Sequence, residues 1–154
     1  MLSLGTISLY RMAVRTWHEG SAQVALQRKL GTAMRQILEG GRGYAENRRH
    51  GLREASNIKV LTPRTIEFTS GVDGAKREFY LNGNELAYRP ANGSIVTIYD
   101  PSRSGSPLEM SSSDTDVQFT QLSDGSIEVR LVGKEKVGDR WITACLVSRV
   151  VPRN

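Results

Sequence analysis

The chain has 154 residues, a hydrophobic fraction of 38%, a formal net charge of +5 and a single cysteine, Cys145. This length suits one domain that folds without a structural metal, and one cysteine excludes an internal disulfide scaffold. A modest positive charge fits proteins that bind nucleic acid or an anionic surface, but it is also common in proteins that do neither. The apolar, strand-like run at residues 141–147 predicts that the Cys145 side chain is buried.

Residues 1–39 predict one long helix. No proline occurs between Leu2 and Glu39, and the pair Gly40-Gly41 follows as a stop signal. Apolar residues recur at steps of three and four on one narrow face, which we expect to pack on the sheet. These residues are Ala22, Leu26, Leu30, Ala33 and Ile37. A helix of this extent is roughly 55 Å long, longer than a domain of this size is wide, so its N-terminal half should project.

The N-terminal half of this helix is apolar on more than one side. Residues 1–10 amount to half of a membrane span, which needs about 20 apolar residues, and Arg11 and Arg15 follow at once. The chain therefore reads as if it starts in the middle of a hydrophobic helix. Trp17 lies close to opposite the core face, and such a helix requires burial in a membrane or between subunits. The residues expected to make these contacts are Leu4, Ile7, Leu9, Met12, Val14 and Trp17.

Residues 40–56 predict a basic connecting loop, which is exposed over residues 40–50. Its arginines are Arg42, Arg48, Arg49 and Arg53. In a functional interpretation they contact the phosphates of DNA or of a lipid headgroup. In the alternative interpretation they are solvated and pair with acidic residues close in the sequence. Those residues are Glu39, Glu46 and Glu54.

Over residues 57–154 the hydrophobic period changes to two, which predicts an antiparallel sheet. Asn82-Gly83 and Ser123-Asp124-Gly125 are turn signals between alternating strands and predict two hairpins. Residues 100–114 predict a long surface loop, and residues 133–140 predict a turn. One helix followed by a run of antiparallel strands defines an α+β fold in a single domain.

No motif in the sequence points to catalysis. His18 and His50 lie far apart, without a carboxylate or cysteine at metal-ligand spacing, and we interpret both as solvated or partly packed side chains. Asp114 and Asp116 are candidates for a calcium site, and the alternative is that they are turn and strand-entry residues. We expect a non-enzymatic protein without cofactor or small-molecule substrate. A composite active site remains an alternative, which a cleft lined by converging polar groups would favour.

The order of these features resembles a known family. After the apolar segment and the long helix come Gly-Leu-Arg-Glu-Ala-Ser-Asn-Ile-Lys-Val at residues 51–60 and Ile-Glu-Phe at residues 66–68. Phe-Tyr-Leu-Asn-Gly-Asn-Glu-Leu-Ala-Tyr-Arg follows at residues 79–89. Over residues 1–90 the chain is similar to the pseudopilins and minor pilins of bacterial type II secretion and type IV pilus systems, above all to J-type minor pseudopilins. The family's Gly-Phe-Thr-Leu-Ile-Glu segment, where prepilin peptidase cleaves, is absent, so no cleavage-site residue is assigned.

The resemblance implies a pilin-like fold and a structural subunit that packs helix to helix in a secretion pseudopilus or type IV pilus. It implies an inner-membrane anchor through the segment missing ahead of Met1, a periplasmic globular part, and other pseudopilin or pilin subunits as partners. Loops 40–50 and 100–114 are candidates for recognising neighbouring subunits. The alternative function is a basic module that binds DNA or anionic envelope components through residues 42–53, with nucleic acid as the second candidate partner.

Overall fold

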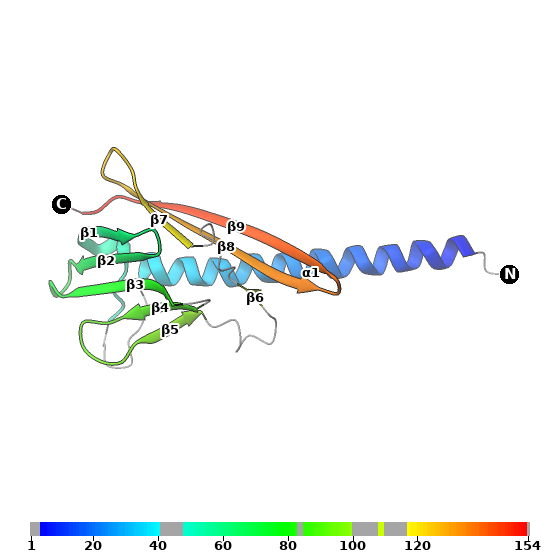
Figure 1. Cartoon of the computed structure of the whole chain (residues 1–154), viewed down its shortest axis with the longest axis horizontal. Coiled ribbons are helices and arrows are strands. Elements are labelled where there is room, and N and C mark those ends of the chain that lie inside the picture. The colour runs from blue at the N-terminus through cyan, green and yellow to red at the C-terminus, as the bar shows by residue number, and fades with distance from the viewer. Residues whose placement is uncertain (1–3, 41–47, 83–84, 100–107, 110–116, 154) are drawn as a thin grey trace.

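The computed structural model describes residues 4–40, 48–82, 85–99, 108–109 and 117–153. One long helix and two antiparallel sheets make up the fold, so the predicted α+β class is correct. The sequence predicted one sheet, whereas the strands divide into two separate sheets. In Figure 1 the helix runs along the longest axis of the molecule, and its N-terminal end extends beyond both sheets.

Helix α1 (Leu4–Glu39) is 36 residues long, close to the predicted extent. Gly40 ends it, because its φ of 116° lies in the region that favours glycine and its N–H donates to the Gln36 carbonyl at 3.0 Å. Ala22, at the start of the predicted core face, is half-buried. The fully buried members of that face are Leu26, Leu30, Ala33 and Ile37.

The first sheet has the strand order β1-β2-β3-β4-β5 and follows the short helix η1 (Leu52–Glu54). Its strands are β1 (Ala55–Thr62), β2 (Thr65–Ser70), β3 (Lys76–Asn82), β4 (Glu85–Arg89) and β5 (Val96–Tyr99). The predicted first hairpin is confirmed, since Asn82 pairs with Glu85. Three buried rings pack together in its core: the centroid of Phe79 lies 5.3 Å from that of Phe68, on which it stacks, and 5.1 Å from that of Tyr88, to which it is tilted.

The second sheet is centred on β8. Its strands are β6 (Leu108–Glu109), β7 (Val117–Gln121), β8 (Ile127–Val137) and β9 (Arg140–Val150). β8 pairs with β6 and β7 along one edge and with β9 along the other. The predicted second hairpin is confirmed, because Gln121 pairs with Ile127 and Gly125 supplies the positive φ of 80° that the turn needs.

The turn predicted at residues 133–140 is wrong for most of its length. β8 continues to Val137, and only Gly138 and Asp139 connect it to β9. The polar run forms a strand because its alternate residues face different surroundings: Glu135 is buried, and its carboxylate lies 3.8 Å from Nζ of Lys29 on α1. The β8–β9 hairpin therefore extends along α1 toward its N-terminal half (Figure 1).

Cys145 is exposed, which corrects the prediction that it is buried. Within β9, Ala144 and Val150 are buried, whereas Trp141 and Val147 are exposed. One face of the strand packs on α1 and the other is open, so an apolar run of this kind does not fix the burial of each member.

A polar cluster, in which His50, Ser70 and Arg77 are buried and Asp73 is exposed, joins the chain after α1 to the turn between β2 and β3. His50, which the sequence placed in an exposed loop, is buried at 5% exposure. A hydrogen bond of 2.8 Å links its Nδ1 to Oγ of Ser70, and its Nε2 lies 3.9 Å from the Asp73 carboxylate. Asp73 accepts hydrogen bonds of 2.8 Å and 2.6 Å from the buried guanidinium of Arg77. The cluster fixes the path of the chain as it leaves the helix.

The hydrogen bonds from Arg77 hold the pKa of Asp73 well below its usual range. A carboxyl group whose pKa falls on folding stabilises the protein above its unfolded pKa, about 3.9, and loses that contribution as the pH drops further. We expect Asp73→Asn to lower the free energy of unfolding at neutral pH by about 2 kcal/mol, less than for a fully buried pair because the carboxyl group is exposed. Urea unfolding should show this difference shrinking between about pH 4 and pH 2. A difference independent of pH would contradict the role of this ion pair.

Candidate functional site

An apolar seam runs along the side of α1 that faces away from the core. Trp17 precedes the buried Leu26 by nine residues, which is about two and a half helical turns, so the two side chains leave opposite sides of the helix. We define the outer seam as the positions that share the side of Trp17 at alternating steps of three and four. They are Ile7, Tyr10, Val14, Trp17, Ser21 and Val24. This spacing is that of residues that pack between two helices.

The outer seam is open to solvent. Trp17 is 68% exposed, Tyr10 71% and Val24 48%. Ile7 and Ser21 are exposed as well, and Val14 is half-buried. A contiguous apolar stripe of this kind on a long helix is a candidate interaction surface, whereas scattered exposed apolar residues need no explanation.

The C-terminal part of the outer seam is hollowed into a groove of about 480 Å³. Its lining residues are Trp17, Gly20, Ser21, Val24, Ala25 and Arg28. A Cβ atom added to Gly20 would meet nothing within 4 Å, so the open space there belongs to the surface and not to the core. A large side chain beside small ones offers both a knob and a hole, as helix-packing surfaces do.

The structure distributes the predicted assembly residues over two sides of α1. Ile7, Val14 and Trp17 belong to the outer seam. Leu9 and Met12 are exposed but lie off it. Leu4 begins the helix, and its side chain lies outside the described part of the chain. Tyr10, Ser21 and Val24 are missing from the predicted set, although the alternating spacing that starts at Ile7 identifies them.

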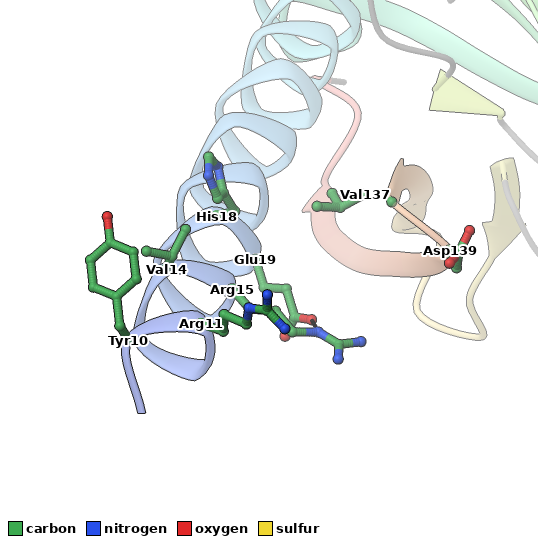
Figure 2. A pocket seen from close by; sticks show the side chains of 9 residues that line it. Tyr10, Arg11, Val14, Arg15, His18, Glu19, Val137 and Asp139 are labelled. Atoms are coloured by element: carbon green, nitrogen blue, oxygen red, sulfur yellow. Dashed lines mark hydrogen bonds and ion pairs between the residues drawn. The ribbon is translucent and has the colours of Figure 1, made fainter. Parts of the chain in front are cut away.

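A second hollow, of about 670 Å³, lies between the N-terminal half of α1 and the β8–β9 turn (Figure 2). Its lining residues are Tyr10, Arg11, Val14, Arg15, His18, Glu19, Val137, Gly138 and Asp139. Oε1 of Glu19 lies 3.2 Å from Nε of Arg15 and 3.8 Å from Nη1 of Arg140, the first residue of β9. This carboxylate therefore links the helix to the hairpin.

The arginines of the basic loop have different surroundings. Arg53 lies 3.8 Å from the Glu39 carboxylate, as the alternative interpretation of this loop expects. Arg48 and Arg49 are exposed, and Arg49 lines a small hollow of about 220 Å³ together with Arg35. Arg42 lies outside the described residues.

The described residues do not assemble a metal centre. They contain no group of three or more His, Cys, Asp or Glu side chains that could hold a metal ion, and Asp114 and Asp116 fall outside them. His50, Ser70 and Asp73 are residue types of a hydrolytic triad, but Ser70 is 1% exposed, so its hydroxyl is not presented to a substrate. Within the same part of the chain, no helix is long and apolar enough to cross a membrane.

In comparisons with known proteins, no protein-family model, no curated protein and no solved structure matches this chain. The features of this chain that bear on its function are the outer seam, the two hollows beside it and the sequence pattern.

Proposed function

We propose that this protein is a structural subunit of a pilin-type filament, of the minor pseudopilin or minor pilin kind, with a pilin-like fold. The observation that carries the proposal is the outer seam, an apolar stripe at helix-packing spacing on the side of α1 opposite its core face. In water such a stripe is unfavourable, and a neighbouring helix would bury it. Its proposed partners are the corresponding helices of other pilin or pseudopilin subunits.

The energetics favour an array over a simple pair. Burying the rest of each half-exposed apolar side chain contributes about 1 kcal/mol, so the five apolar members of the outer seam contribute about 5 kcal/mol on each of two paired helices. Association costs about 4 to 15 kcal/mol in lost translational and rotational freedom, which is comparable to the total gain of the pair. A single seam contact is therefore marginal. Stable assembly requires each helix to touch several neighbours, as in a filament with a helical core.

The arrangement of the layers suits such a filament. The N-terminal end of α1 projects beyond the sheets, so helices can bundle there while the sheets remain on the outside (Figure 1). The exposed Ile7 and Leu9 at this end suit lipid before assembly and neighbouring helices afterwards. The proposed location is the bacterial inner membrane with a periplasmic globular part, and then a filament of the cell envelope.

The test of this function is photo-crosslinking in the envelope of the producing cells. Benzoylphenylalanine in place of Trp17 is similar in size and sits at an exposed position, so the fold should tolerate it. We expect irradiation to give a cross-link that maps to an apolar helix of another envelope subunit or of a second copy of this chain. The matched control carries the same group in place of the exposed Leu61 of β1 and should give no cross-link to such a helix. If the photoreactive group at position 17 gives no more cross-link to such a helix than the same group at position 61, the proposal is wrong.

A further inference from the structure

Exposed cations from two elements lie at the end of the β8–β9 hairpin. Arg11 and Arg15 line the hollow from α1, and Arg140 reaches it from the hairpin. Lys136 also flanks the turn, but it follows the buried Glu135 and therefore lies on the face of the hairpin away from α1. The side chain of Arg15 is 60% exposed and that of Arg140 64%. We call these four residues the basic collar. Two carboxylates, those of Glu19 and Asp139, face the same region, so positive charge is in excess there even with His18 neutral.

The carboxylate of Glu19 positions this collar. Because it lies within ion-pair distance of both Arg15 and Arg140, it holds a guanidinium from the helix beside one from the hairpin. Figure 2 shows Arg15 and Glu19 on the side of α1 toward Val137 and Asp139, with Tyr10 extending on the other side. Arg11, Arg15 and Arg140 thus lie close together where the hairpin ends against the projecting helix.

Aromatic and apolar side chains flank the basic collar in a definite order. Tyr10 and Trp17 are exposed on α1 at the level of the collar, and Trp141 is exposed beside the turn, where it pairs with Lys136 across the strands. Nearer the N-terminus come the exposed Ile7 and Leu9. From the N-terminus onward, apolar residues therefore come first and aromatic and basic residues follow. Membrane proteins show the same order from the interior of the bilayer to its headgroups.

We propose that the basic collar binds the phosphate headgroups of an anionic lipid surface, so that the β8–β9 turn rests on the membrane before assembly. This inference rests on the proposed function for the direction in which α1 enters the membrane. Lipid is the occupant because a free phosphate or a nucleic acid makes no use of Ile7 and Leu9. Near an anionic surface each lysine or arginine strengthens binding roughly fivefold, so charge at the hairpin tip adds measurably to what the helix supplies.

The test measures partitioning of the full chain onto vesicles of phosphatidylcholine alone or mixed with phosphatidylglycerol. We expect binding to be stronger to the vesicles that contain phosphatidylglycerol, and on these vesicles to fall roughly 25-fold in the double variant Lys136→Gln, Arg140→Gln. The matched control is Arg48→Gln, Arg49→Gln, which removes the same charge from exposed residues after the opposite end of α1 and should leave binding nearly unchanged. Melting followed by circular dichroism should be the same for all three proteins.

Three outcomes would overturn the inference. Equal losses in the two double variants would show a non-specific effect of net charge, and equal binding to both kinds of vesicle would exclude headgroup recognition. Displacement by inorganic phosphate, beyond that caused by chloride at equal ionic strength, would indicate a small-anion site instead of a membrane surface. If any of these three results is found but position 17 still cross-links to a helix, the membrane inference fails and the filament proposal stands. If vesicle binding depends on the basic collar but position 17 gives no such cross-link, the filament proposal alone is refuted.

Discussion

Replacing Gly51 with alanine is expected to destabilise the protein by about 3 kcal/mol or more. Gly51 lies where the chain passes back across the end of its own helix. An added Cβ would lie 2.4 Å from the backbone N of Gly40 and 2.5 Å from the carbonyl oxygen of Leu38. The φ of Gly51, −134°, suits any residue, so the cost is one of contact and not of backbone conformation. Relief requires the helix end to move, and with it the fully buried Leu52.

Gly31 provides the matched control for this substitution. It lies inside α1, and a Cβ added there would meet nothing within 4 Å. Alanine is the better helix former by up to about 1 kcal/mol, so Gly31→Ala should stabilise the protein slightly. Urea unfolding followed by circular dichroism compares the two variants. A Gly51→Ala protein that unfolds at the same urea concentration as the wild type would disprove the close crossing of the chain at Gly40 and Gly51.

The elements predicted correctly are those whose signals are local. The period of α1 and its stop at Gly40 depend on neighbours within one or two turns. The hairpins that pair Asn82 with Glu85 and Gln121 with Ile127 depend on short turns of polar residues and glycine. Each signal acts within a few residues, so the tertiary structure had little scope to override it.

The errors occur where distant contacts decide the structure. Residues 133–136 are a glycine and three charged residues and suggest a turn, but they form a strand because α1 lies alongside and Lys29 accompanies the buried Glu135. Cys145 sits in an apolar run yet faces solvent, because β9 offers only one of its faces to α1. The cluster of His50 with Asp73 and Arg77 joins segments that the sequence gives no reason to connect.

The candidate site was predicted only in part, for a related reason. Two apolar stripes lie on one helix, and their members alternate along the sequence around residues 22–26. The core stripe, from Ala22 to Ile37, is the easier one to recognise. The outer seam is harder to recognise in the sequence, because its member Val24 falls between Ala22 and Leu26 of the core stripe. Trp17 was recognised because it lies opposite the core stripe, whereas Val24 becomes visible only when the steps of three and four are followed from Ile7.

A glutamate at Val24 should abolish assembly while leaving the isolated chain stable. Val24 on the outer seam and Val72 in the turn after β2 are matched in exposure, at 48% and 45%. Neither Val24→Glu nor Val72→Glu should change the free energy of unfolding by more than about 0.5 kcal/mol, because both side chains can remain in water. Between packed helices an unpaired carboxylate costs several kcal/mol, which lowers the affinity of each seam contact by about a hundredfold or more.

The measurement is the fraction of each variant that sediments with envelope filaments of the producing cells, relative to its total amount. We predict that Val72→Glu is incorporated at the wild-type level and that Val24→Glu falls to background, with both chains folded. Incorporation of the Val24→Glu chain at the wild-type level would contradict assembly through the outer seam.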